Sequence, residues 1–322
     1  MRQPVFSVII PARNEAENIA ATIKSIKSND IQKNPYEIIV VDDASTDETA
    51  QLALTLGAKV IRGDKKADTI AALRNRGACV AAGDVLIFID ADMVVPSDIF
   101  ECVWGYFSTG FKGVVGFSLT VPQEAGWVGR AWADRGGHGY FRTKDVDYLP
   151  GGNIFINREV FEEIGGFTET LRAGEDKDMT FKAKAAGYRV VYSPERSVIH
   201  MGFEKGLAEF IRKEFWRQGQ TLGLAARWGY SMRALRNPVL SLYHLTALLA
   251  VPVSLFFLKF YLVLVAVWVG PSVLIVLKDV DFKRPTETME VLALTFIRWN
   301  VAAIALVFQL ARPLFAARRA PL

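Results

Sequence analysis

The amino-acid sequence predicts an α/β protein, with a mostly parallel sheet covered by helices on both faces and membrane helices at the C-terminal end. Two observations predict this. Short β-branched runs at 5–10, 37–41 and 84–89 alternate with segments of helical periodicity. Between residues 238 and 277 the only full charge is Lys259. Strands alternating with helices indicate a covered parallel sheet, and apolar runs of this length are typical of membrane helices.

The first elements each have a local signal. Val5–Ile10 is a buried strand that Pro11 ends. Asn14 is the expected N-cap of the first helix, with Glu15 and Glu17 in its first turn. After the second strand, Ser45 or Thr46 is expected to cap a helix that runs to Leu56 and ends at Gly57.

The remaining elements follow the same alternation and then become less regular. We expect a strand at 59–61, a helix at 68–82, a strand at 84–89 and a helix from Pro96. Residues 120–147 are rich in Gly, Trp, Arg and Asp, and we expect them to face the substrate. Beyond them we expect strands at 149–156 and 189–192 and helices at 158–164, 176–186 and 205–220.

Composition divides the chain into three parts: a domain of mixed polar and apolar composition at 1–203, an amphipathic juxtamembrane region at 204–237 and a membrane region at 238–322. Between 204 and 236 there are seven basic and three acidic residues, which suits an anionic membrane surface. We expect a helical hairpin at about 238–277 and a third apolar helix at about 289–311.

The third apolar helix has two possible placements. Arg298 and Asn300 lie near its middle, and arginines follow it. A crossing helix would place those arginines outside, against the positive-inside rule, so a helix lying in the interface fits better. Alternatively, Arg298 contacts an anionic lipid headgroup inside the bundle.

Net charge, cysteines and the N-terminus limit the class of partner and the cellular compartment. A scattered net charge of +4 gives no reason to expect nucleic acid as a partner. Two cysteines, Cys79 and Cys102, fit a reducing compartment, and Val5–Ile10 is too short for a signal peptide. We therefore expect a cytosolic catalytic domain at the cell (inner) membrane. Oligomeric state is left open.

Two acidic clusters directly follow predicted strands: Asp42-Asp43 and Asp90-Ala91-Asp92. Ligands of such sheets bind outside the carboxyl ends of the strands, so these carboxylates should gather at one rim. Mg²⁺ is held by one or two carboxylates plus substrate phosphates, and a metal neutralises a diphosphate leaving group. Helix capping is the alternative explanation of Asp42-Asp43, but Ser45 or Asp47 could cap the helix alone, so the two acids need another reason; an Asp-x-Asp triplet alone is often only a turn.

Three further positions are candidates. Arg74 lies on the helix before the fourth strand and is either a phosphate or base contact or part of a solvated face. Glu175-Asp176 opens a helix and supplies either a general base or an acidic cap. His200 is either a metal ligand or a neutral core histidine.

Five segments together resemble the family 2 glycosyltransferases of GT-A fold, which transfer sugars from nucleotide-sugar donors. The resemblance covers roughly residues 5–200 and is specific for the family rather than for a sugar or acceptor. The segments are SVIIPARNEAENI at 7–19, VVDDASTDET at 40–49, ALRNRGACVAAGDVLIFIDAD at 72–92, GGNIFINREVFEEIGGF at 151–167 and GEDKDMTFKAKAAGYRV at 174–190.

The resemblance implies a role for each matched position. The nucleotide would be bound by Pro11, Ala12, Glu15, Asp43, Arg74 and Asp90, with Asp43 on the uracil of a UDP-sugar. Mn²⁺ or Mg²⁺ would be held by Asp92, with Asp90 and His200. Asp176 would be the general base of an inverting transfer, with Glu175 as the fallback, and Gly152, Asn153, Trp216 and Arg217 would lie near the donor sugar or acceptor.

Departures from the family pattern bear on the acceptor. The Gln-x-x-Arg-Trp motif of processive synthases is missing, and Phe215–Gln220 stands in its place. Polyprenyl-phosphate glycosyltransferases generally lack the Glu-Asp pair, so a lipid-linked or membrane-associated acceptor is favoured over a polyprenyl phosphate. A non-catalytic membrane scaffold stays open as an alternative. A nucleotidyltransferase would need glycines that 11–15 lacks.

Overall fold

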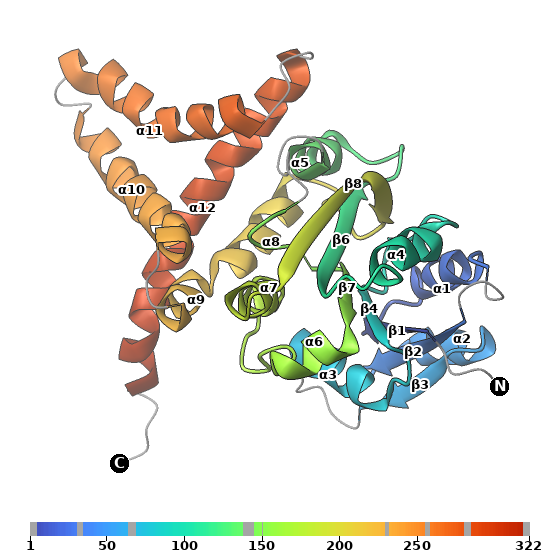
Figure 1. Ribbon diagram of the computed structural model, residues 1–322. Coiled ribbons are helices and arrows are strands. Elements are labelled where there is room, and N and C mark those ends of the chain that lie inside the picture. Colours follow the sequence, from blue (N-terminus) through green and yellow to red (C-terminus); the bar gives the residue numbers. More distant parts are fainter. Residues whose placement is uncertain are drawn as a thin grey trace. The chain divides into compact units, whose positions relative to one another are not determined.

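The computed structural model describes residues 5–30, 35–63, 69–137, 145–149, 151–228, 232–254, 258–279 and 285–317 (Figure 1). The chain forms two compact units. The first contains residues 1–124 and 141–203, and the second contains residues 125–140 and 204–322. Each unit is described by itself.

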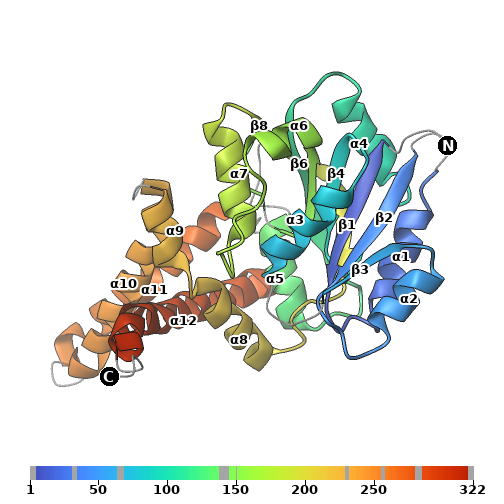
Figure 2. The ribbon, with the colours of Figure 1, turned by 90° about the horizontal axis from the view of Figure 1, so that it is seen from below.

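The first unit is built on an eight-stranded sheet with the order β3-β2-β1-β4-β7-β6-β8-β5. Its strands are β1 (Phe6–Ala12), β2 (Tyr36–Asp42), β3 (Lys59–Arg62), β4 (Val85–Ile89), β5 (Met93–Val94), β6 (Gly113–Thr120), β7 (Asn153–Asn157) and β8 (Arg189–His200). The first four strands are parallel, as predicted, and Figure 2 shows β1, β2 and β3 side by side.

The second half of the sheet is mixed rather than parallel. Strand β7 is antiparallel to both β4 and β6, and β5 is antiparallel to β8. Because β7 runs opposite to β4, it begins at the rim where β4 ends. The backbone N–H of Asp90 donates to the carbonyl of Gly152 across 3.1 Å at this point. The reversal therefore brings the Gly151-Gly152 turn to the predicted ligand rim.

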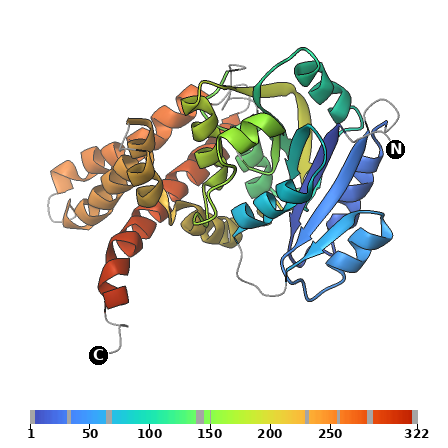
Figure 3. The ribbon, with the colours of Figure 1, turned by 60° about the horizontal axis from the view of Figure 1, so that its bottom comes forward.

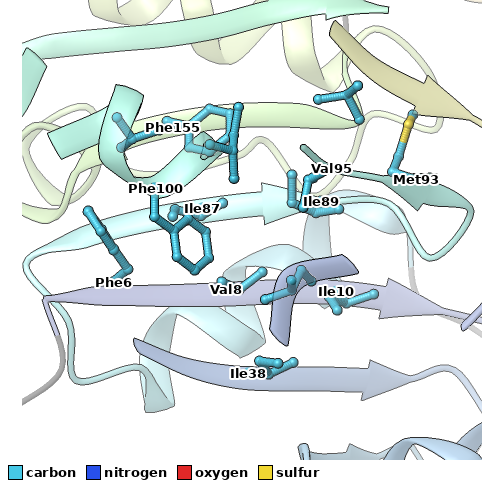
Figure 4. Packing of buried hydrophobic residues seen from close by; sticks show 14 of the residues in the cluster. Phe6, Val8, Ile10, Ile38, Ile87, Ile89, Met93, Val95, Phe100 and Phe155 are labelled. Atoms are coloured by element: carbon cyan, nitrogen blue, oxygen red, sulfur yellow. The ribbon is translucent and has the colours of Figure 1, made fainter. Parts of the chain in front are cut away.

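Helices cover both faces of the sheet. They are α1 (Ile19–Lys27), α2 (Thr49–Thr55), α3 (Ile70–Val80), α4 (Ile99–Phe107), α6 (Arg158–Glu163) and α7 (Glu175–Ala185). Successive residues of a strand point to opposite faces. Accordingly Phe6, Val8 and Ile10 belong to one buried cluster (Figure 4), whereas Ile9 belongs to a second cluster on the other face.

Two predicted helix starts are wrong, for one shared reason. Helix α1 begins at Ile19 and α2 at Thr49, so neither Asn14 nor Ser45 is an N-cap. Asn14 has a left-handed φ of 52° and its side chain accepts from the backbone N–H of Thr46. The capping residues join two loops to each other instead of starting helices.

Three other regions differ from the sequence-based prediction. Within 120–147, residues Trp127–Gly137 form helix α5. Residues 138–144, which include His138, lie outside the described residues. Strand β6 has no counterpart among the predicted elements. Strand β8 extends from Arg189 to His200 instead of ending at 192.

The second unit is helical and contains α5, α8 (Leu207–Gln218), α9 (Thr221–Arg227), α10 (Met232–Ser254), α11 (Leu258–Asp279) and α12 (Pro285–Ala317). A small apolar core joins α5, α8, α11 and α12 through Val128, Phe210, Val276 and Leu294. Figure 3 shows α10, α11 and α12 lying together. Among the described helices, only α12, over Pro285–Ala311, is long and apolar enough to cross a membrane, and half of its apolar window is buried.

Arg298 on α12 has a protein partner, which corrects the expectation of a lipid headgroup. Its Nε lies 3.1 Å from Oε2 of Glu214 on α8. The guanidinium also packs 5.0 Å from the ring centre of Trp299 and 5.6 Å from that of Trp132. Burial would raise the pKa of Glu214, but Arg298 and Arg217 outweigh it and hold that pKa below its ordinary value. The charge near the middle of α12 is therefore neutralised within the protein.

Candidate active site

The loops that follow β1 and β2 are tied to each other by hydrogen bonds. The backbone N–H of Asn14 donates to Oγ of Ser45 (2.9 Å), and that of Glu15 donates to Oγ1 of Thr49 (2.7 Å). Asn14 and Ala44 both have positive φ, of 52° and 50°. Non-glycine residues adopt this conformation only when surrounding contacts hold them there, and such contacts cluster at functional sites.

Asp43 is buried beside these two loops. Its side chain is 8% exposed, and Oδ2 accepts from Nη1 of Arg13 at 2.8 Å. Its other oxygen, Oδ1, is buried and has no hydrogen-bond partner within the described part of the chain. A buried carboxylate oxygen without a donor is unfavourable, so this atom marks a place where a ligand N–H would be stabilised.

The acidic triplet lies beside Glu15. Burial, and then the charges of Asp92 and Asp90, raise the pKa of Glu15, against the hydrogen bond from Asn18 that lowers it. The carbonyl of Ala91 accepts from Oγ1 of Thr22 on α1 at 2.6 Å, which fixes the triplet on the sheet. The ends of strands β1 and β4 thus place Glu15 within electrostatic range of Asp90 and Asp92.

Asp92, which directly precedes β5, and His200, at the end of β8, form a close pair of potential metal ligands. Oδ2 of Asp92 lies 3.2 Å from Nε2 of His200, because β5 pairs with the end of β8. The pair packs tightly on Gly202, where an added Cβ would lie only 1.9 Å from Oδ2 of Asp92. No group of three or more potential ligands occurs among the described residues, so a metal here would need oxygen atoms from a substrate.

Asp176 faces the same rim from the N-terminus of α7. Its Oδ2 accepts from the backbone N–H of Gly151 at 2.6 Å, and Oδ1 accepts from the N–H of Lys177 at 2.8 Å. A Cβ on the adjacent Gly152 would lie 3.0 Å from Oδ2 of Asp90. The Gly151-Gly152 turn therefore lies between Asp176 and the acidic triplet, and both glycines allow close approach of these carboxylates.

Glu175 and Arg74 are buried beside this turn. The Arg74 side chain is 1% exposed, and it donates to Oε1 of Glu175 (2.8 Å) and to Oδ1 of Asp90 (2.7 Å). Burial and the neighbouring Asp176 raise the pKa of Glu175, while Arg74 lowers it. Glu175 is thus occupied by an internal ion pair, whereas Asp176 is only half-buried.

The other predicted site residues are placed differently. Pro11 and Ala12 are buried at the end of β1, so only their backbone borders the rim. The amide of Asn153 is engaged with the backbone of Phe117, accepting at 2.7 Å and donating at 3.1 Å, which indicates a structural role. Trp216 and Arg217 belong to the second unit, where Arg217 pairs with Glu204 and Glu214.

Sequence reasoning assigned no role to three residues at this rim. Arg13 pairs with Asp43, Gly202 contacts Asp92, and Nη1 of Arg76 would lie 3.5 Å from a Cβ on Gly63, next to the Asp42-Asp43 loop. Arg13 and Arg76 lie inside two of the segments that resemble the family. Their position in those segments could have indicated that they lie near the acidic residues. Gly202 had no such indication, because the extension of β8 was not predicted.

Comparisons with known proteins indicate the family and the fold. The sequence model of glycosyl transferase family 2 matches residues 7–165, about half of the chain. Glycosyltransferase AglE of Haloferax volcanii is 28% identical over 66% of this chain and 71% of its own length. Beta-monoglucosyldiacylglycerol synthase of Synechocystis is 24% identical over 67% of this chain, which spans 48% of that relative.

Two solved structures share the fold with TM-scores of 0.54 and 17% sequence identity. One is the mannosyltransferase PcManGT from Pyrobaculum calidifontis in complex with GDP-Man and Mn²⁺, which covers 100% of this chain and 77% of its own. The other is S. aureus TarS 1–349 in complex with UDP-GlcNAc, which covers 96% of this chain and 92% of its own. The α/β sheet with its covering helices is therefore of GT-A type.

Proposed function

The chain belongs to glycosyl transferase family 2 through residues 7–165, and from this premise we propose a specific reaction. The protein transfers a hexose from a UDP-sugar, with inversion, to a hydroxyl of a lipid-linked or membrane-associated acceptor. One observation carries the proposal. The Gly151-Gly152 turn contacts Asp176 on one side and Asp90 on the other, so a donor-side and a base-side carboxylate share one rim.

The buried Oδ1 of Asp43, which lacks a donor among the described residues, supports binding of a nucleotide base at the β1–β2 end of the rim. Uracil offers an N–H at N3, and Oδ1 of Asp43 is a buried acceptor that lacks a donor among the described residues. The TarS structure of the same fold contains UDP-GlcNAc, but PcManGT contains GDP-Man, and guanine also offers an N–H. The donor panel below therefore includes both nucleotides.

The residues at the rim fit a divalent cation. Asp92 and His200 supply one carboxylate and one imidazole, Asp90 lies nearby, and Mg²⁺ or Mn²⁺ completes such a set with diphosphate oxygens. When bound, the metal would neutralise charge on the departing diphosphate. Burial first, and then the charges of Asp92 and Asp90, raise the pKa of Glu15 beside this pair, and a bound cation would act against the contribution of those charges.

Asp176 is positioned to act as the general base. It is half-buried, and two backbone N–H groups stabilise its ionised form. In the proposed step the acceptor oxygen bonds to the anomeric carbon as the bond from that carbon to the diphosphate breaks. The hydroxyl proton passes to the Asp176 carboxylate, and the bonding electrons leave with UDP. One displacement inverts the configuration.

The acceptor class is supported by a relative and by the second unit. The Synechocystis relative is by name a glucosyldiacylglycerol synthase, which implies a lipid product. Large apolar side chains are exposed on α10 and α11, among them Leu242, Leu249, Leu262 and Leu274. We propose that this surface contacts the cytosolic leaflet of the cell membrane and keeps the enzyme beside its acceptor.

The ion pair of Arg298 with Glu214 supports placing α12 at the interface rather than across the bilayer. Glu214 lies on α8, which also carries Glu209, Arg212, Lys213 and Arg217. A spanning α12 would draw this charged helix towards the bilayer centre, where charges are very unfavourable. Thiol labelling in a Cys79→Ser/Cys102→Ser background tests this. Cysteines at 286 and 310 should both react from the cytosolic side, and reaction of one only from the outside would show that α12 crosses.

The reaction is tested with a panel of UDP- and GDP-sugars and membrane lipid extract, with nucleotide release measured with and without Mn²⁺. We expect metal-dependent release for at least one UDP-sugar and loss of that release in Asp176→Asn. A variant with near-normal turnover would remove Asp176 as the base. Tight UDP binding without turnover on any donor would favour the non-catalytic scaffold.

A further inference from the structure

Arg74 is a buried cation whose two terminal nitrogens both bind protein carboxylates, while its Nε has no hydrogen-bond partner among the described residues. It lies on the buried face of α3, and Gly77 on the same face lets α3 pack so closely on β1 that an added Cβ would lie 2.4 Å from Cγ2 of Ile9. The ring of Phe167 covers the guanidinium at 5.3 Å from its centroid. Both terminal nitrogens are already bound to carboxylates of the protein.

The two carboxylates come from opposite sides of the candidate active site. Asp90 ends β4 and belongs to the donor-side triplet, and Glu175 opens α7 next to the general base. The Arg74 contacts measure 2.7 and 2.8 Å, which is the range of strong charge-assisted hydrogen bonds. A planar guanidinium bound at both ends fixes the separation of its partners, which a lysine ammonium does not.

We propose that Arg74 is a positioning residue that ties the donor-side Asp90 to the base-side Glu175-Asp176 pair, rather than a contact to the nucleotide. This inference rests on the proposed function, because the two sides are named by their roles in transfer. In this proposal Arg74, the first arginine of the ALRNRG segment, aligns α7 with the end of β4.

The charges around Glu175 show why the bridge matters for the base. Glu175 faces Arg74 from α3 and Asp176 from its own helix, with Asp90 on the far side of Arg74. Burial alone would lower the pKa of Arg74, but Asp90 and Glu175 raise it above its ordinary value, so the guanidinium stays charged. Without that cation, burial and the charge of Asp176 would raise the pKa of Glu175 unopposed, directly beside the proposed base.

Two variants and a rescue test the bridge. Arg74→Lys keeps the charge without the fork, and we expect kcat to fall about 10- to 100-fold, as for other residues that orient a site. The KM for the donor should change little, because in this proposal Arg74 does not contact the nucleotide. Arg74→Met leaves Glu175 buried and unpaired, so it should unfold more easily, and adding Glu175→Gln should restore part of the lost thermal stability.

Arg158→Met is the control, because Arg158, at the start of α6, is a partly buried arginine that donates to the carbonyls of Gly83 and Ala78 instead of bridging two carboxylates of the site. It should leave kcat unmoved. An Arg74→Lys variant with a raised donor KM and an unchanged kcat would overturn the proposal in favour of a nucleotide contact. If the wild type turns over no donor, the proposed function fails. The bridge is then judged by the Glu175→Gln rescue, and absence of rescue overturns it.

Discussion

Gly202→Ala is expected to disable the metal pair without touching a charged residue. The added Cβ would lie 1.9 Å from Oδ2 of Asp92 and 3.2 Å from Nε2 of His200. Real Cβ contacts essentially never fall below 3.0 Å, so the Asp92 carboxylate would have to retreat by at least about 1.1 Å (3.0 minus 1.9). Asp92 is held by its backbone, because its carbonyl accepts from the N–H of Met201 at 2.7 Å. The side chain must therefore rotate away from His200.

The size of the effect follows from that displacement. A misplacement of about 1 Å in an active site can lower turnover about 100-fold, and we expect a loss of this order in kcat/KM. The assay is donor turnover over a range of Mn²⁺ concentrations, alongside thermal unfolding. Gly105→Ala is the control, because nothing lies within 4 Å of its added Cβ. A Gly202→Ala protein that keeps wild-type turnover at low Mn²⁺ would refute the assignment of Asp92 and His200.

Three further predictions follow from single contacts. Asp43→Ala should weaken UDP binding about 10- to 100-fold by calorimetry, since it removes a charged hydrogen bond, whereas Arg13→Met, which keeps the acceptor oxygen, should lose less; equal losses would contradict the base contact. Glu15→Gln should raise the melting temperature at neutral pH. The folded-state pKa of Glu15 is raised, so its ionised form opposes folding above the unfolded pKa of about 4.5, and the gain should vanish below that pH; a constant difference from pH 4 to 8 would exclude this cause. Arg298→Met should destabilise the protein by about 3 kcal/mol in denaturant unfolding, because it leaves Glu214 buried with Arg217 alone, and a further Glu214→Gln should recover much of the loss; additive losses would show that the pair is not coupled.

The parallel half of the fold was predictable because its signals are local. Strands β1 to β4 are short apolar runs with punctuation at their ends, and the acidic residues follow them directly. That placed Asp43, Asp90 and Asp92 at strand ends from spacing alone. Family resemblance added Asp176, which lies on a helix far along the chain and has no local signal that would place it beside Asp90.

The remainder depended on tertiary contacts. Asn14 and Ser45 are good caps by type, but each forms its hydrogen bonds with the opposite loop. Arginine is a residue type that usually lies on the exposed face of a helix. Only the arrangement of α3, β4 and α7 reveals that Arg74 is buried between two carboxylates. Strand β7 runs antiparallel to β4, and this places the Gly151-Gly152 turn at the rim. The strand direction depends on long-range pairing, which a short stretch of sequence does not predict.

A crystal structure of the protein with UDP and Mn²⁺ tests the central claim most directly, which is that one nucleotide and one cation bind among Asp43, Asp92 and Asp176. We predict the uracil edge against Oδ1 of Asp43, the metal against Asp92 and His200, and the diphosphate on the side of the rim that Asp176 faces. Nucleotide bound elsewhere, or a metal that contacts neither Asp92 nor His200, would contradict the account.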